Sequence, residues 1–408
     1  MTDLERLEGA FAAGELVSPL GPGPRLPDLS RALYGLAGLP AATLAKAGAK
    51  GAALTSEALE LQRLIGPAEH YVLVLVDGLG DAMLARAPEG GFLRERRAGS
   101  LRTVWPSTTA AALTALATGE WPGRHAVPGW WVWLDPPGLS AEVVPFVERF
   151  GRRPLGEHGV RPEEVFTVPS AVARLGHEPL AIMPAEIAGS VYSRYCAGGT
   201  ATAGYKAQAE AFDLAAARVL AAARPSFTYV YVPHVDGACH DHGVGSPQAI
   251  GLLEQFDRLL DAFAERLGGR ARIVVTGDHG LVDIPPERSL FIDEGDPLLD
   301  LLRWCPNGES TALLLHVRPG REEAFAAGFR ERYGEFFGLL SAGEAESLGL
   351  FGPEGLSELA RARVGDFVTV AWRPAALYYR ARQGKVHVHR ASHAGLSPDE
   401  MLVPLVLA

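Results

Sequence analysis

The chain has 408 residues, of which 48% are hydrophobic and 21% are charged, so it can bury a large core and is not intrinsically disordered. Its formal net charge of −10 argues against a protein that coats nucleic acid, because such proteins carry a basic surface. Three scattered cysteines exclude a disulfide framework, and the sequence shows neither a signal peptide nor a membrane span of roughly 20 apolar residues. We therefore expect a cytoplasmic protein without a membrane partner, and the composition leaves the oligomeric state open.

The N-terminal part of the chain is expected to begin with loops and then to alternate between helix and strand. Residues 15–50, rich in proline, glycine and alanine, are interpreted as a surface wrap that leads into a helix at about 54–65. The apolar run YVLVLV at 71–76 predicts a strand that is buried on both faces. The alanine- and leucine-rich stretch 109–118 predicts a helix, and Gly119 stands where a helix C-terminal glycine is expected.

The middle of the chain continues this alternation. An alanine-rich helix is predicted at 204–223, and the strand FTYVYV follows at 227–232. Apolar residues at spacings of three and four then predict an amphipathic helix over 250–263, which leads into a third buried strand at 272–276. Strands that alternate with helices in this way predict a layered α/β fold with a mainly parallel central sheet.

Residues 286–385 have a different pattern. They contain the short strand candidates TALLLHV, DFVTVAW and AALYYR and one helical stretch, REEAFAAGFRERYGEFFGLL. We interpret this segment as an inserted α+β cap subdomain. The main domain is then formed by residues 1–285 together with 386–408.

Three of the predicted strands end in an aspartate: Asp77, Asp236 and Asp278. The carboxyl ends of strands are where ligands bind in open α/β sheets. His240 follows Asp236 by four residues, so one helical turn would direct both side chains to one point. Oxygen and imidazole ligands without thiolates suit zinc, manganese or another borderline divalent ion.

The stretch TGDHG places Asp278 and His279 between two glycines. We expect Gly277 and Gly280 to let the chain turn sharply at the end of the strand. A buried acid beside a buried imidazole is costly unless something pairs them. On this evidence a metal ion and a salt bridge are both acceptable partners.

Other histidines are weighed by their neighbours. His393 is a candidate ligand by position, in the stretch SHAGLSPDEM. His234 and His242 are interpreted as neighbours of the site rather than as ligands. His387 and His389 alternate along a predicted strand, which favours a surface or sheet-packing role.

The stretch PSTT offers three hydroxyl groups at a helix start: Ser107, Thr108 and Thr109. Such a residue commonly caps the helix. The same position also favours phosphate binding, and a hydroxyl becomes nucleophilic when a metal or a base lowers its pKa. Residue type alone does not choose among the three.

Taken in order, the stretches VDGLGD, PSTTAAALTALATG, VDGACH, TGDHGLVD and SHAGLSPDEMLVPLV resemble the alkaline phosphatase superfamily. The resemblance is best to its type I phosphodiesterase/nucleotide pyrophosphatase branch, and it spans roughly residues 70–285 and 386–408. It implies a three-layer α/β sandwich with an inserted subdomain. It also implies two divalent metal ions at the carboxyl edge of the sheet, zinc first and manganese as the alternative.

The resemblance assigns roles residue by residue. Asp77, Asp278 and His279 match the ligands of one metal ion. Asp236, His240 and His393 match the ligands of the other. Thr109 matches the nucleophile, which also contacts the metal, when counted either back from Thr118 or forward from Pro106; Thr108 is the alternative.

The implied activity is hydrolysis of phosphodiester or pyrophosphate bonds in a small phosphate ester, with a nucleotide among the candidates, through a phosphothreonine intermediate. One departure concerns the phosphate-binding asparagine of the family, whose position holds Trp130 in this chain. Trp130 and Trp131 are interpreted either as an aromatic wall for the substrate or as a packing cluster. Alternative functions are a phosphomonoesterase or phosphonate hydrolase with the same site and, if the nucleophile were lost, a catalytically silent module.

Overall fold

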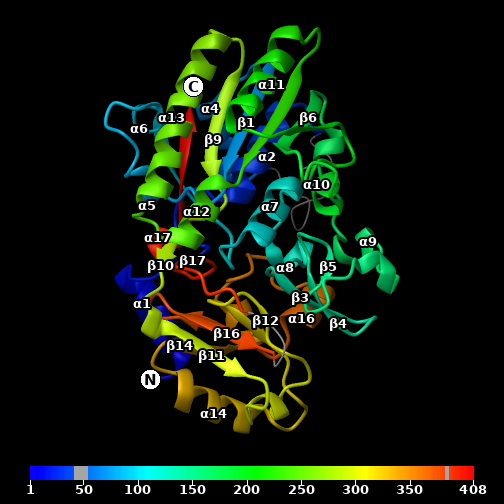
Figure 1. Ribbon diagram of the computed structural model, residues 1–408, viewed down its shortest axis with the longest axis vertical. Helices are drawn as coiled ribbons and strands as arrows, with labels where there is room; N and C mark the ends of the chain where they lie inside the picture. The colour runs from blue at the N-terminus through cyan, green and yellow to red at the C-terminus, as the bar shows by residue number, and fades with distance from the viewer. Residues whose placement is uncertain (41–53, 382–385) are drawn as a thin grey trace.

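The structure is a computed structural model that describes residues 1–40, 54–381 and 386–408. Figure 1 shows two halves, each built around a sheet, with the C-terminus in the upper half and the N-terminus in the lower half. The last residues of both the predicted wrap at 15–50 and the predicted cap at 286–385 lie outside the described residues. The wrap prediction is wrong for α2 (Leu26–Leu36), a largely buried helix.

The main sheet has seven strands, of which the five neighbours β9, β1, β8, β6 and β7 pair with one another in parallel. The order across the sheet is β2-β18-β9-β1-β8-β6-β7, and only β18 pairs antiparallel, with β9 and β2. Its strands are β1 (His70–Val76), β2 (Arg97–Arg102), β6 (Glu178–Pro184), β7 (Thr202–Tyr205), β8 (Ser226–Val232), β9 (Arg272–Gly277) and β18 (Leu402–Leu407). The parallel neighbours β9, β1 and β8 therefore place their carboxyl ends side by side.

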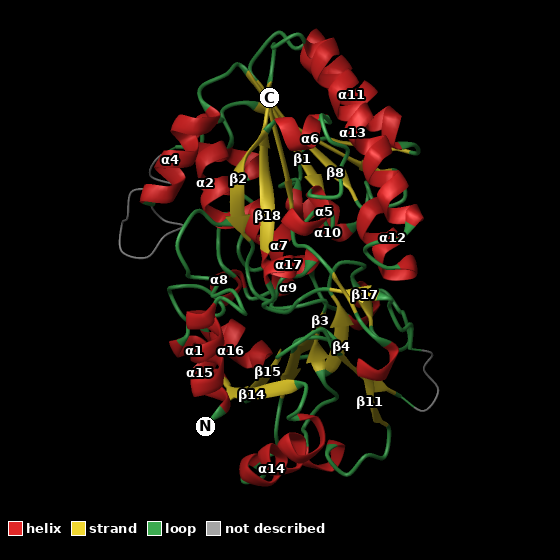
Figure 2. Cartoon of the chain, turned by 90° about the vertical axis from the view of Figure 1, so that its left-hand side faces the viewer, coloured by secondary structure: helices red, strands yellow, loops and turns green. Residues whose placement is uncertain are grey.

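Helices cover both faces of this sheet. Side chains alternate along β1, so the odd-numbered residues from Tyr71 to Leu75 pack on one side and the even-numbered residues from Val72 to Val76 on the other. The first side holds α2, α4 (Ser56–Ile65) and α7 (Thr109–Thr118), and the second holds α11 (Gln208–Ala221) and α13 (Pro247–Leu267). Figure 2 shows α2 and α4 opposite α11 and α13. The predicted α/β fold with a mainly parallel central sheet is confirmed.

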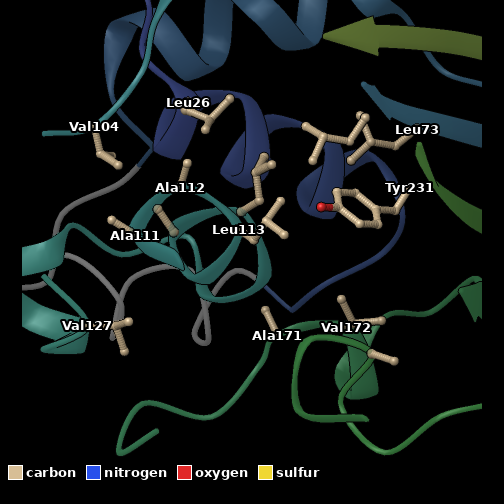
Figure 3. Close-up of a cluster of buried hydrophobic side chains, with 14 of the residues drawn as sticks. Leu26, Leu73, Val104, Ala111, Ala112, Leu113, Val127, Ala171, Val172 and Tyr231 are labelled. Atoms are coloured by element: carbon tan, nitrogen blue, oxygen red, sulfur yellow. The ribbon is translucent and has the colours of Figure 1, made fainter. Parts of the chain in front are cut away.

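The helix α7 is held against the sheet by small side chains. All ten of its residues are buried, and its alanines allow a close approach to α2 and to the strands. In Figure 3, Ala112 and Leu113 lie in one cluster with Leu26 of α2 and with Leu73 and Tyr231 of the sheet. Close packing of this kind fixes the start of α7 relative to the strand ends.

Several local predictions are confirmed. The strands predicted at 71–76, 227–232 and 272–276 are β1, β8 and β9. The helices predicted at 54–65, 109–118, 204–223 and 250–263 are α4, α7, α11 and α13. Gly119 ends α7 with a φ of 76°, in the left-handed region that favours glycine. In the described part of the chain, no helix has the length and apolar character that crossing a membrane needs.

The lower half contains a second, antiparallel sheet of order β14-β15-β13-β12-β3-β4-β5. Its strands are β3 (Trp131–Leu134), β4 (Leu139–Glu142), β5 (Val147–Glu148), β12 (Asn307–Gly308), β13 (Leu313–Leu315), β14 (Phe337–Ser341) and β15 (Phe367–Ala371). Residues 131–148 thus join the sheet that 286–385 would otherwise form alone, and the N-terminal helix α1 (Asp3–Ala13) packs on β14. The division of the chain at 286 and 385 stays a prediction.

Short elements complete the lower half and the connections. The helix α14 (Glu322–Tyr333) packs against the second sheet, and β11 (Ser289–Asp293) pairs parallel with β16 (Ala376–Arg380). The remaining helices are α5 (Asp81–Leu84), α6 (Phe92–Glu95), α8 (Pro122–His125), α9 (Pro162–Val165), α10 (Val191–Cys196), α12 (His234–His242), α15 (Ala342–Ser347), α16 (Glu358–Val364) and α17 (Pro398–Met401). The strand predicted around 386–390 is wrong, because this stretch makes no ladder before β17 (Ala391–Ser392).

A buried arginine ties α16 to the segments around α8 and α9. Arg363 is 3% exposed, and its guanidinium donates hydrogen bonds to the carbonyl oxygens of Ala126, Val165 and Glu164, the last two at 2.8 and 2.9 Å. A charged donor that satisfies three buried carbonyl groups cannot be removed without leaving them unpaired.

We expect Arg363→Met to lower the melting temperature by several degrees, because each buried carbonyl left unpaired costs about 1–3 kcal/mol. The control is Arg361→Met on the same helix. The Arg361 side chain is 48% exposed and pairs with Glu346 at the surface, where an ion pair contributes about 0–1 kcal/mol. Thermal unfolding followed by circular dichroism compares the two variants, and equal shifts would contradict the role of Arg363.

Candidate active site

One group of acidic and imidazole side chains lies at the ends of β1 and β9. Asp77 follows β1, and Asp278 and His279 follow β9, the neighbouring parallel strand. His279 Nε2 lies 3.4 Å from Asp77 Oδ1 and 3.5 Å from Asp278 Oδ2, and all three residues are buried. One atom from each comes within 4.8 Å of the other two, which is close enough for all three to contact a single ion.

A second group adjoins the first. Asp236 and His240 stand one turn apart on α12, which follows β8, and His240 Nε2 lies 3.2 Å from Asp236 Oδ2. His393 follows β17, which pairs antiparallel with β10 (Val282–Asp283) and so returns the C-terminal segment to the end of β9. The ring of His393 stacks on that of His279 with centroids 3.8 Å apart. The structure therefore brings together all six side chains that the resemblance assigns to metal ions.

The orientation of the three imidazole rings is fixed by backbone carbonyl groups. In each ring Nδ1 faces a carbonyl oxygen: Ala391 for His240 at 2.8 Å, Gly280 for His279 at 3.1 Å and Ser107 for His393 at 3.1 Å. Because a carbonyl only accepts, Nδ1 is the donor in each ring, and Nε2 is the nitrogen that presents a lone pair whenever the ring is neutral. This is the arrangement by which a protein orients histidine ligands toward a metal ion.

The buried carboxylates are short of partners. Among the described residues, Asp77 Oδ1, Asp236 Oδ1 and Asp278 Oδ2 are buried and accept no hydrogen bond. Burial raises the pKa of Asp77 well above its usual value, and the charge of Asp278 raises it further; burial also raises the pKa of Asp278. Divalent cations would satisfy these oxygen atoms and offset the repulsion, so the residues present fit such ions.

Protonation differs across the second group. Burial lowers the pKa of His240, but the charge and the hydrogen bond of Asp236 outweigh it and raise the pKa to about 9. The same pairing lowers the pKa of Asp236 in spite of its burial. Burial and the neighbouring His279 hold the pKa of His393 well below its usual value. In the absence of a cation, His240 is thus the charge that balances Asp236.

The three hydroxyl groups of the PSTT stretch point in different directions. Ser107 Oγ donates to the carbonyl of Gly395 at 2.8 Å, and Thr108 Oγ1 donates to Glu309 Oε1 at 2.6 Å. Thr109, the first residue of α7, places Oγ1 at 3.1 Å from His279 Nε2. Of the three, Thr109 is the one whose hydroxyl lies against the ligand groups.

A cavity of about 660 Å³ opens over this site, between the two sheets. Thr109, Asp236, His240 and His393 line its base. Its outer wall comes from the lower half of the molecule: Trp130, Trp131, Glu142, Arg149, Phe150, Arg152, Glu309, Ser310, Tyr378 and Tyr379. Both predicted tryptophans therefore face the cavity, although the guanidinium of Arg149 covers one face of Trp131 at 4.0 Å.

Sequence reasoning missed several side chains at the site. Glu309 lies in the turn between β12 and β13, and Arg149 follows β5; no sequence motif connects either residue with PSTT. Tyr231 donates to Asp77 Oδ2, and only its place one residue before the end of β8 could have indicated this. His389, predicted to face a sheet or the surface, lies in the cavity wall with its ring centroid 4.1 Å from that of His240.

The chain bends at Asp278 as predicted, and the two glycines around Asp278-His279 serve close approach at this bend. Neither Gly277 nor Gly280 has a positive φ. A Cβ at Gly277 would lie 2.2 Å from the carbonyl oxygen of Leu79, and one at Gly280 would lie 2.0 Å from that of Asp399. A side chain at either position would push apart the segments that hold the ligands.

Residues 71–385 match the family described as type I phosphodiesterase / nucleotide pyrophosphatase. The match covers more than half of the chain, so the chain belongs to this family, and the resemblance seen in the sequence is confirmed. The family and its structural neighbours hydrolyse phosphoester and related bonds. No curated protein sequence matches the chain significantly.

Solved structures share the fold at low sequence identity. Murine ectonucleotide pyrophosphatase / phosphodiesterase 5 superposes with a TM-score of 0.61 at 16% identity, covering 82% of this chain and 87% of its own. The human protein of the same name gives 0.62 at 14% identity, with 83% and 87% covered. Phosphonoacetate hydrolase from Sinorhizobium meliloti 1021 gives 0.61 at 19% identity, with 82% and 89% covered.

We expect zinc to raise the melting temperature of the metal-free protein by several degrees, because an ion that binds only the folded state stabilises it. Asp278→Asn should abolish most of this increase. It should leave the metal-free protein at least as stable as the wild type, since one of the mutually repelling buried charges is gone. Thermal shift assays and metal content per chain measure both effects.

The matched control is Asp241→Asn, an exposed acid on the same helix as Asp236 that faces His387 at the surface. It should keep the full increase with zinc. An undiminished zinc effect in Asp278→Asn would contradict the assignment of Asp77, Asp278 and His279 to one metal ion.

Proposed function

We propose that the protein hydrolyses phosphodiester or pyrophosphate bonds of a small phosphate ester, with Thr109 as nucleophile and two divalent metal ions as cofactors. The observation that carries the proposal is the position of Thr109. Thr109 is the first residue of a buried helix; its hydroxyl lies 3.1 Å from His279 Nε2 of the first ligand group, and the residue lines the same cavity as Asp236, His240 and His393 of the second. Members of the family act on bonds of this class.

Two groups of side chains would bind the two metal ions. Asp77, Asp278 and His279 would hold one ion, and Asp236, His240 and His393 the other. When bound, these ions supply positive charge that lowers the pKa of a nearby hydroxyl and neutralises the phosphoryl oxygens. Zinc fits the mixed carboxylate and imidazole ligands, with manganese as the alternative.

Thr109 Oγ1 would attack phosphorus and form a phosphothreonine while the bond to the leaving group breaks. The first turn of α7 has backbone N–H groups without intrahelical partners, and its dipole favours negative charge at this end. A phosphoryl group on Thr109 would therefore sit where the helix stabilises its oxygens. Water then cleaves the phosphothreonine and regenerates the hydroxyl.

The structural neighbours support this substrate class. Murine ectonucleotide pyrophosphatase / phosphodiesterase 5 was solved as an inactive variant, with a threonine replaced by alanine, in complex with AMP. The phosphonoacetate hydrolase was solved with phosphonoacetate. A phosphonate hydrolase acting through the same site is therefore the second candidate. A cytoplasmic location stays part of the proposal.

We expect Thr109→Ala to lower kcat for bis-p-nitrophenyl phosphate by about 10³-fold or more, because the attacking oxygen is removed. Thr109→Ser keeps that oxygen and should retain a measurable part of the activity. Initial rates in the presence of zinc, with and without a chelator, measure the effect.

The controls separate the candidates. Ser107→Ala removes a hydroxyl that is bonded to the carbonyl of Gly395, and should leave most of the activity. Full activity in Thr109→Ala would exclude Thr109 as the nucleophile and point to Thr108. Turnover of phosphonoacetate without turnover of any diester would favour the phosphonate hydrolase.

A further inference from the structure

We propose that Glu309 selects the substrate: its carboxylate disfavours phosphoryl groups with two negative charges, so the enzyme prefers diesters and internal pyrophosphates to phosphomonoesters. This inference rests on the proposed function and adds a specificity-determining residue to it. Glu309 comes from the turn between β12 and β13, in the lower half of the molecule, and reaches the start of α7 in the upper half.

Glu309 is held firmly at the edge of the catalytic groups. One of its oxygens, Oε1, accepts the hydroxyl of Thr108 at 2.6 Å and the backbone N–H of Trp130 at 2.7 Å. Thr108 is the residue directly before Thr109. The side chain is buried, and it lines the same cavity as Thr109 and His240. The carboxylate is therefore held in one orientation, in the wall of the cavity that Thr109 also lines.

The negative charge of Glu309 has no cation in direct contact, although the charges of His240 and Arg149 act on it from farther away and lower its pKa. Among the described residues, it makes no ion pair within 4.0 Å. The two arginines of the cavity are engaged elsewhere: Arg149 donates to the carbonyl of Pro306 at 2.6 Å and covers Trp131, and Arg152 pairs with Glu142. Glu309 is thus an acid of the cavity wall with which neither arginine of the cavity forms an ion pair.

Trp130 also makes the cavity less favourable for a doubly charged phosphoryl group. By the resemblance, Trp130 occupies the position of a phosphate-binding asparagine. A tryptophan has no side-chain amide that could donate to phosphate as an asparagine does. The backbone N–H of Trp130 is bonded to Glu309, so Glu309 takes up this donor and leaves only the indole N–H of Trp130 for a substrate.

The charge of the phosphoryl group decides how strongly Glu309 repels a substrate. A phosphodiester carries one negative charge, whereas a phosphomonoester carries close to two above its second pKa of about 6. The repulsion from a fixed carboxylate grows in proportion to the substrate charge. Burial raises the pKa of Glu309 to about 7, against the hydrogen bonds from Thr108 and Trp130 that lower it, so alkaline pH keeps the side chain ionised.

The test compares kcat/KM for bis-p-nitrophenyl phosphate and for p-nitrophenyl phosphate at alkaline pH, with zinc bound. Glu309→Gln keeps an oxygen that accepts both hydrogen bonds and loses the charge. We expect the ratio of monoester to diester kcat/KM to rise by about tenfold or more. Glu309→Asp keeps the charge and should keep the ratio close to that of the wild type. If Glu309→Gln does not fold, Glu309→Met, which is also uncharged and of similar length, serves for the same comparison.

Glu400→Gln is the matched control. Glu400 is also a buried acid that accepts a hydroxyl, from Ser397 at 2.6 Å, and a backbone N–H, from Gly395 at 2.8 Å, but it lies outside the cavity lining. In Glu400→Gln the ratio of monoester to diester kcat/KM should stay unchanged. An unchanged ratio in Glu309→Gln, or an equal loss on both substrates, would overturn the inference while wild-type diester turnover still upholds the proposed function. Absence of diester turnover in the wild type would instead refute the proposed function.

Discussion

The mutual repulsion of buried carboxylates at one edge of the main sheet is the constraint on which the rest of the site depends. Asp77, Asp236 and Asp278 converge because β9, β1 and β8 are adjacent and parallel, so their carboxyl ends meet. Each charge costs several kcal/mol to bury without a partner. The packing of α7, α12 and the β10–β17 pair around these ends, together with hydrogen bonds such as that from Tyr231 to Asp77, keeps the acids in place. Ion binding and the stability of this edge are therefore coupled in the same residues.

The two halves of the molecule contribute different functions to one cavity. The strand ends of the main sheet and the start of α7 supply the candidate metal ligands and the proposed nucleophile, and the close approach at Gly277 and Gly280 allows little change there. The second sheet supplies the outer wall, including Trp131 and Arg149. Because the outer wall is built from turns and from the ends of short strands, its side chains can vary without moving the ligands. Under the proposed function, substrate choice is therefore a property of the lower half, whereas the chemistry belongs to the upper half.

Much of the main domain could be predicted from the sequence, because period and composition act locally. The apolar runs that became β1 and β9, and the spacing that became α13, depend on neighbouring residues only. The six ligand positions were assigned by resemblance, since spacing alone linked only Asp236 with His240. The pairing of β3 with β12 and the reach of Glu309 could not be predicted, because both join segments that lie far apart in the sequence. The stretch before β17 had strand-like alternation but finds no partner strand.

The start of α7 links the nucleophile to substrate choice. A helix start directs consecutive side chains to different sides, so Ser107, Thr108 and Thr109 face the C-terminal segment, the second sheet and the ligand groups in turn. The hydroxyl of Thr108, which is not the proposed nucleophile, is the one that donates to Glu309. The acid thus takes its position from the same turn that positions the nucleophile, and a shift of this turn would move both together. Glutamine at position 309 would keep an oxygen that accepts from Thr108 and Trp130, so under the proposal selectivity can change while the turn that carries Thr109 keeps its hydrogen bonds.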